Sequence, residues 1–239
     1  MKLDLLVLAV HPDDAELGCS GTLLKYIAQG KKAGIIDLTR GELGTRGTAE
    51  TRDKEAADAA AILGLSMRGN LAMRDGFFRN DEAHQLQVIH AIRKHQPEIV
   101  FTNAPADRHP DHGRASDLVN DAAFLAGLRK IVTHDAEEVQ EPWRPKLVLE
   151  FIQDQYHQPD IILDVTAQWD NKLKSILAYK TQFFNPDYDE PDATYISSPA
   201  FLRIVEGRAR EFGKSIGAEY GEGFVSRKLL GVTDLFSLL

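Results

Sequence analysis

Cysteine is almost absent from this sequence of 239 residues, and basic residues are outnumbered. The single cysteine, Cys19, cannot form an internal disulfide and excludes Cys-rich zinc or iron–sulfur sites, so any metal must have nitrogen and oxygen ligands. Lysine and arginine total 28 against 36 aspartate and glutamate residues, a formal charge of −8, and no basic run occurs. This composition argues against a nucleic-acid-binding protein.

Long apolar runs are also missing. No stretch approaches the ~20 apolar residues that a membrane span requires, and the opening MKLDLLVLAVHPDD has no signal-peptide cleavage site. We therefore expect a cytoplasmic protein that does not bind membranes. With 43% hydrophobic and 27% charged residues, the composition is typical of a globular chain, and we expect one domain over residues 1–239.

Buried strands alternate with helices along the chain. Residues 3–10 form an apolar run of strand length, residues 21–29 have helical spacing and end at Gly30, and residues 33–38 form a second apolar run. The same alternation predicts further strands at 98–102, 146–152 and 160–165 and further helices at 50–63, 82–95, 114–126, 167–181 and 199–216. We expect a Rossmann-like α/β fold, with a mostly parallel sheet, helices on both faces and the active site at the carboxyl ends of the strands.

Two polar motifs follow predicted buried strands. HPDD occupies positions 11–14 directly after the first strand, and HPDH occupies positions 109–112 shortly after the 98–102 strand. Because ligands bind beyond the carboxyl ends of parallel strands, both motifs should face one crevice. Together they supply three imidazoles and several carboxylates, without a thiolate.

That set of side chains favours a metal-dependent hydrolase. Two histidines and one carboxylate are a common ligand set for catalytic zinc, and they also suit iron(II) or other divalent metals. A remaining aspartate beside metal-activated water can act as general base, and a remaining histidine can donate to a developing oxyanion. A magnesium-dependent phosphohydrolase and a non-catalytic metal or sugar-binding protein are the alternatives, although imidazoles suit Mg²⁺ poorly.

Other features are interpreted as structural. The three histidines at 84, 90 and 95 lie on one polar helix, and Cys19 is expected to pack in the core. The glycine-rich segment 41–47 lacks the Gly-Lys-Ser/Thr ending of a phosphate loop and is expected to lie at the rim of the site. No role in the chemistry is assigned to His157 or to the polar loop at 185–198.

AVHPDDAELGCSGTL and DRHPDHGRAS resemble the paired signatures of the PIG-L/LmbE-like family of metal-dependent N-acetylglucosamine deacetylases. The resemblance covers essentially the whole chain, and GELGTRGTAETRDKEA and NLAMRDG are similar to the bacterial branch that acts in low-molecular-weight thiol synthesis. One departure is visible: the usual glutamate after the paired aspartates is displaced to Glu16 by Ala15.

The family pattern implies a role for each residue of the two motifs. One zinc ion per chain would be held by His11, Asp14 and His112. Asp13 would be the general base and later the general acid. His109 would stabilise the tetrahedral intermediate, and Asp111 would orient His109.

The resemblance also implies a substrate. The enzyme would remove the N-acetyl group from a small N-acetylglucosaminide, with N-acetylglucosaminyl L-malate of bacillithiol biosynthesis as the first candidate and a chitooligosaccharide or inositol conjugate as alternatives. Arg52 and Asp75 would contact sugar hydroxyls. The malate carboxylates need a locally basic pocket, for which the candidates are Arg46, Arg52, Arg108 and Arg144, with Arg108 the first choice because it adjoins His109. The branch further implies a homo-oligomer, a trimer or hexamer, with the segments 185–198 and 232–239 as contact surfaces.

Overall fold

The main sheet contains strands from both halves of the chain. The computed structural model describes residues 1–188 and 192–238, so part of the predicted loop at 185–198 lies outside the described residues. Seven described strands form one sheet in the order β3-β2-β1-β4-β7-β9-β8. These strands are β1 (Leu5–Ala9), β2 (Ala33–Thr39), β3 (Met67–Met73), β4 (Ile99–Asn103), β7 (Leu147–Phe151), β8 (Ile161–Asp164) and β9 (Gly221–Val225).

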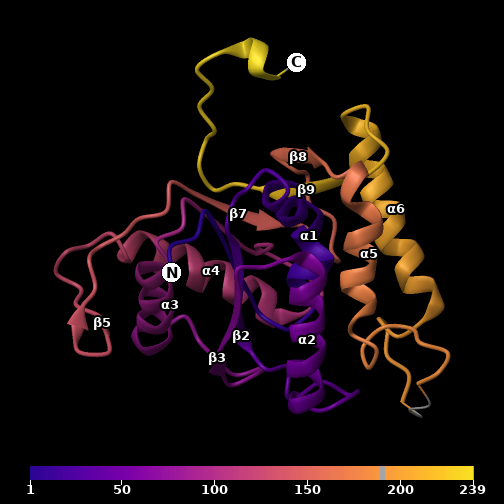
Figure 1. Cartoon of the computed structure of the whole chain (residues 1–239), viewed down its shortest axis with the longest axis horizontal. Helices are drawn as coiled ribbons and strands as arrows, with labels where there is room; N and C mark the ends of the chain where they lie inside the picture. Colours follow the sequence, from indigo (N-terminus) through magenta and orange to yellow (C-terminus); the bar gives the residue numbers. More distant parts are fainter. Residues whose placement is uncertain (189–191, 239) are drawn as a thin grey trace.

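Helices cover both faces of this sheet (Figure 1). The helices α3 (Glu82–His95) and α4 (Pro110–Leu125) lie on one face. The other side carries α1 (Asp14–Ile27), α2 (Ala49–Leu63), α5 (Trp169–Leu177) and α6 (Pro199–Ser215). A hairpin of β5 (His134–Asp135) and β6 (Glu138–Val139) and two 3₁₀ turns, Thr166–Gln168 and Leu235–Leu238, complete the described elements.

The predicted fold class is confirmed. Strands β1, β2, β3, β4 and β7 pair in parallel, and β9 runs antiparallel between β7 and β8. Every residue of β1 and β2 is buried, as expected for apolar strands covered on both faces. None of the helices in the described part of the chain has the length and apolar character that a bilayer crossing needs.

Two strands of the main sheet and two helix starts differ from the sequence-based expectation. Strand β3 was not predicted because its sequence, MRGNLAM, has a charged and a glycine residue near its centre, and β9 was not predicted because GEGFV has too few apolar residues. Helices α1 and α4 begin at Asp14 and Pro110, earlier than expected. Proline is common at the first position of a helix, so the Pro-Asp sequence at 110–111 was a start signal.

A buried ion pair connects β9 to the helices that cover it. Lys172 on α5 is 2% exposed, and its Nζ donates to Glu222 Oε1 on β9 at 2.7 Å. The same Nζ donates to the Glu16 and Leu17 carbonyl oxygens of α1, and Glu222 accepts hydrogen bonds from the backbone of Gly21 and Thr22. Lys172 therefore connects α5, the helix that carries it, to both α1 and β9.

Replacing Lys172 with methionine should lower the free energy of unfolding by about 3 kcal/mol, because it leaves the Glu222 carboxylate buried without its cation. Urea unfolding followed by circular dichroism measures this change. Lys174→Met on the same helix is the matched control, since Lys174 Nζ donates at the surface, to Asn171 Oδ1. Equal stabilities of the two variants would contradict this role of the buried pair.

Candidate active site

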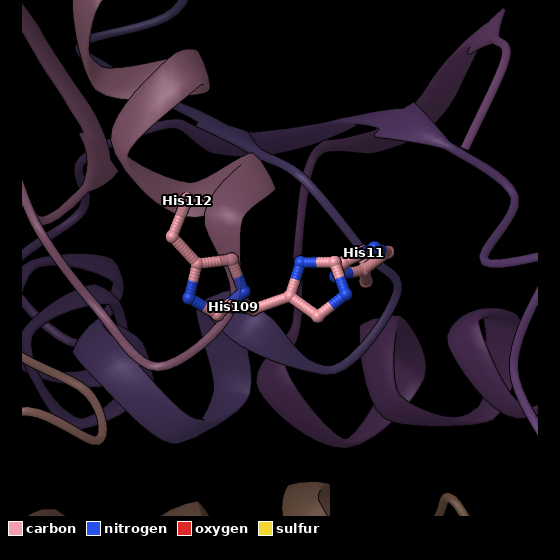
Figure 2. A group of neighbouring side chains, drawn as sticks. All are labelled: His11, His109 and His112. Atoms are coloured by element: carbon pink, nitrogen blue, oxygen red, sulfur yellow. The ribbon is translucent and has the colours of Figure 1, made fainter. Parts of the chain in front are cut away.

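The two predicted motifs meet at the carboxyl ends of β1 and β4, which are neighbouring parallel strands. His11 lies in the turn between β1 and α1, while His109 and His112 lie at the start of α4. Figure 2 shows the three imidazole rings gathered together. They line an open cavity of about 290 Å³, whose wall also includes the glycine-rich segment at 43–44 and the segment 194–196. The predicted rim position of the glycine-rich segment is therefore observed.

One carboxylate oxygen lies between two of these imidazoles. Asp14 Oδ2 is 3.5 Å from His11 Nδ1 and 3.3 Å from His112 Nε2. All three residues are buried. Metal–ligand distances of about 2.1 Å in a tetrahedral site place the ligand atoms roughly 3.4 Å apart, so this spacing fits a single bound divalent cation.

Each of the two imidazoles has a carboxylate at its other nitrogen. His11 Nε2 is 2.9 Å from Asp75 Oδ1, and His112 Nδ1 is 2.9 Å from Asp107 Oδ2. Carboxylates in this position orient metal-binding histidines and select the tautomer whose free nitrogen faces the metal. Asp107 was missed by sequence reasoning, although it lies only two residues before the HPDH motif.

These contacts change the pKa values of the metal-free site. Burial lowers the pKa of His11, but Asp14 and Asp75 outweigh it and raise that pKa to about 9. Burial also lowers the pKa of His112, and Asp14 and Asp107 raise it to about 10. Burial raises the pKa of Asp14, yet the two histidines bring it well below its usual value. A bound cation would take the place of the two imidazole protons.

Two amide side chains hold Asp14 in place. Asn103, the last residue of β4, donates from Nδ2 to Asp14 Oδ2 at 3.1 Å and accepts from the Val10 backbone N–H. Gln153, just after β7, donates from Nε2 to Asp14 Oδ1 at 2.7 Å. Sequence reasoning missed both residues, because a single amide at the end of a strand has no distinctive pattern.

A different ligand set is also close enough to bind a cation. Nitrogens of His11, His109 and His112 all lie within 4.8 Å of one another, and His11, Asp75 and Asp111 form a second such group. The ring centroids of His11 and His109 are 4.8 Å apart. The geometry therefore supports a divalent cation bound by His11 and His112. The third ligand would be either Asp14 or His109.

Asp13 lies beside this group in a strained backbone conformation. Its φ is 123° and ψ is −25°, a combination that non-glycine residues rarely adopt. The carboxylate is buried and accepts a hydrogen bond from Arg52 Nη2 at 2.8 Å. Burial raises the pKa of Asp13 to about 7, against the opposing charge of Arg52. A carboxylate with a pKa near neutrality is well suited to proton transfer.

His109 is oriented by a backbone group rather than by the Asp111 carboxylate. The Asp111 backbone N–H donates to His109 Nδ1 at 3.3 Å, which leaves Nε2 as the protonated nitrogen of a neutral ring. Burial and the neighbouring imidazoles lower the pKa of His109. The Asp111 carboxylate instead accepts from the Gly76 backbone N–H at 2.8 Å and pairs with Arg114.

The predicted substrate contacts separate into three groups. Arg144 does not line the cavity: it precedes β7, before the strand rather than at its carboxyl end, and donates to the Phe124 carbonyl oxygen. Assigning Arg144 to the substrate was therefore wrong. Arg52 and Asp75 do line the cavity, but they contact Asp13 and His11. Arg108 lies at the rim, with its Nε 2.7 Å from Asp154 Oδ2 and its guanidinium over Tyr195.

Residues interpreted as structural lie away from this chemistry. Cys19 is fully buried in the core that packs against β1, and burial raises the pKa of its thiol well above the usual value. His84 and His90 lie on α3, where they contact Asp81 and Asp135. His157 is half-buried, with Nε2 2.6 Å from the Ala106 carbonyl oxygen.

A buried, strained carboxylate beside an imidazole–carboxylate cluster, at the carboxyl edge of a doubly wound sheet, is an arrangement suited to hydrolysis at a bound divalent cation. The particular family follows from comparison with known sequences. The chain belongs to the PIG-L family, described as GlcNAc-PI de-N-acetylase, whose model matches residues 6–123. The predicted family and enzyme class, an amidohydrolase, are thereby confirmed.

Individual proteins are similar over nearly the full chain. Diacetylchitobiose deacetylase of Thermococcus kodakarensis is 27% identical over 228 residues, covering 91% of this chain and 80% of its own. The conserved protein TT1542 of Thermus thermophilus has a TM-score of 0.84 at 39% identity, covering 97% of this chain and 98% of its own. N,N'-diacetylchitobiose deacetylase of Pyrococcus horikoshii has a TM-score of 0.80 at 25% identity, covering 98% of this chain and 88% of its own.

Weaker similarity extends to a deacetylase named for another substrate and to an enzyme named for another reaction. A probable N-acetyl-alpha-D-glucosaminyl L-malate deacetylase 2 of Bacillus anthracis is 27% identical over 130 residues, covering 49% of this chain and 58% of its own. A 4-oxalmesaconate hydratase of Pseudomonas putida is 27% identical over 190 residues, covering 72% of this chain and 70% of its own. Similarity to a single relative therefore does not define the substrate.

Metal content distinguishes the two possible ligand sets. We expect His112→Ala and Asp14→Ala to lose a stoichiometric divalent metal, because each removes a ligand atom, whereas His109→Ala should retain it. Mass spectrometry of metal content after dialysis measures this. Asp107→Asn should weaken binding by about 10- to 100-fold, because it removes the partner of His112 Nδ1. Loss of the metal from His109→Ala with retention in Asp14→Ala would instead support the three-histidine set.

Proposed function

We propose that this protein hydrolyses the N-acetyl group of a small N-acetylglucosaminide, with one zinc ion bound by His11, Asp14 and His112. The observation that carries the proposal is the position of the Asp14 carboxylate between two imidazoles, with the Asp13 carboxylate beside it and bound to Arg52. Other divalent metals, including iron(II), suit the same ligand types. Zinc would polarise the acetyl carbonyl and lower the pKa of water at its open position toward ~7.

The residues of the chain divide the proton transfers between them. Asp13 accepts a proton from the attacking water and later delivers a proton to the departing amine, a task that suits its pKa of about 7. His109 faces the cavity and donates from Nε2 to the oxygen of the tetrahedral intermediate. Asp111 supports His109 through its backbone N–H. The products are a free glucosamine amine and acetate.

N-acetylglucosaminyl L-malate is the substrate that we propose first. The Bacillus anthracis relative supports it by name, and Arg108 supports it chemically, since a guanidinium at the rim of the cavity can meet a malate carboxylate. The archaeal relatives support diacetylchitobiose equally well by name. Three aspartates at positions 13, 14 and 75 also line the cavity, so a dianionic substrate depends strongly on Arg108.

Some sequence-based expectations stay predictions. These are the single domain over residues 1–239, the homo-oligomeric assembly and the cytoplasmic location. An apolar contact surface is available for assembly in the C-terminal segment, which extends away from the sheet after β9 (Figure 1). Leu229, Leu235 and Phe236 in this segment are all more than 70% exposed.

Asp13→Ala tests the mechanism directly. We expect the variant to bind zinc normally but to release amine from the substrate at least ~10²-fold more slowly, because the general base is lost. Fluorescamine detection of the free amine measures the rate, and chelation of the wild type provides the metal-free reference. Full activity in Asp13→Ala would contradict the mechanism, and phosphate release from a phosphosugar by the wild type would favour a phosphohydrolase.

Comparison of substrates tests which group is attached to the N-acetylglucosamine of the natural substrate. We expect amine release to be faster from N-acetylglucosaminyl L-malate than from free N-acetylglucosamine or diacetylchitobiose. Arg108→Met should raise KM for the malate conjugate by about 10-fold and leave the neutral substrates unchanged, because one charge-assisted contact is removed. Arg144→Met is the matched control, since Arg144 lies outside the cavity. Faster turnover of diacetylchitobiose would replace the malate assignment with the oligosaccharide one.

A further inference from the structure

Arg52 has few contacts for a buried guanidinium. Its side chain is 6% exposed, and Nη2 donates both to Asp13 Oδ2 at 2.8 Å and to Gln182 Oε1 at 2.9 Å. Nη1 reaches the Gly41 carbonyl oxygen only at 3.5 Å, and Nε has no hydrogen-bond partner among the described residues. Gln182 therefore supplies one of the two short contacts that fix this cation.

The amide of Gln182 has a defined orientation. Gln182 is 4% exposed, and its Nε2 donates to the Arg46 carbonyl oxygen at 2.7 Å and to Thr181 Oγ1 at 2.9 Å. Rotating the amide by 180° would place its NH₂ group against the Arg52 guanidinium, two donors facing each other. The carbonyl oxygen of Gln182 must therefore face Arg52.

The segment that carries Gln182 is itself attached to α2. Thr181 donates from its backbone N–H and its Oγ1 to the Glu55 carboxylate at 2.7 and 2.8 Å, and Glu55 lies one turn after Arg52 on that helix. The segment also packs closely on the glycine-rich loop: a Cβ at Gly47 would lie 2.8 Å from Thr181 Oγ1. Residues 181–182 thus connect α2 to the loop that forms one wall of the cavity.

We propose that Gln182 is a positioning residue for the reaction, holding the Arg52 guanidinium against the general base Asp13. Arg52 is the only side chain with a hydrogen bond to the Asp13 carboxylate in the described structure, and Asp13 caps no backbone N–H. Without Gln182, the guanidinium keeps one short contact and can turn into the cavity. The orientation of the base would change with it, and misplacement of about 1 Å is enough to slow catalysis strongly. This inference rests on the proposed function.

Gln182→Met tests the proposal, because methionine keeps the volume of glutamine and removes its polar groups. We expect kcat for amine release to fall by about 10- to 100-fold, with KM and zinc content unchanged. Gln140→Met is the matched control: Gln140 is also a buried glutamine, and its Nε2 donates to the His90 carbonyl oxygen, far from the cavity. An equal loss of kcat in both variants, or unchanged kcat in Gln182→Met, would overturn the proposal.

A double variant separates positioning from an independent role. If Gln182 acts through Arg52, Arg52→Met/Gln182→Met should be no slower than Arg52→Met alone, whereas multiplied losses would overturn the proposal. A crystal structure of Gln182→Met gives a readout that needs no substrate: we expect the Arg52–Asp13 contact to be lost, and an unchanged contact would contradict us. Failure of the wild type to deacetylate any N-acetylglucosaminide would count against the proposed function alone.

Discussion

The arrangement of this site depends on one carboxylate, that of Asp14, which lies between imidazoles from two separate loops. Asp14 is the first residue of α1, and His112 lies in the first turn of α4. Both helices follow neighbouring parallel strands, so their amino-terminal ends lie side by side at one edge of the sheet. The partial positive charge of a helix amino terminus favours a carboxylate there, in addition to the hydrogen bonds from Asn103 and Gln153.

The surrounding side chains explain why two adjacent aspartates have different properties. Asp14 accepts several hydrogen bonds and faces two imidazoles, so its pKa is held well below the usual value. Asp13, the next residue toward the amino terminus, has among the described residues only Arg52 as a hydrogen-bonded charged partner, and burial raises its pKa to about 7 against the charge of that guanidinium. A strained φ of 123° turns Asp13 away from the position that a regular helix cap would take. The two carboxylates can therefore serve as ligand and as base.

Several parts of this site could be predicted because they leave a local pattern. The HPDD and HPDH motifs follow apolar runs of strand length, and the crevice rule for parallel sheets joins them. Asp107, Asn103 and Gln153 leave no such pattern, because each acts through a contact with a residue distant in sequence or on another element. The error over Arg144 has the same origin: its charge is visible in the sequence, but its position before β7, away from the site, is not.

The sequence by itself determined the fold class, the chemical nature of the ligands and the identity of the two motifs, because apolar periodicity and the residue types near strand ends are local properties. Only the tertiary structure decided which carboxylate faces which imidazole, and that Arg52 binds Asp13. It also decided that Gln182, 130 residues after Arg52, contacts the same guanidinium. Such contacts join distant segments, and their geometry is set by how helices and loops pack on the sheet.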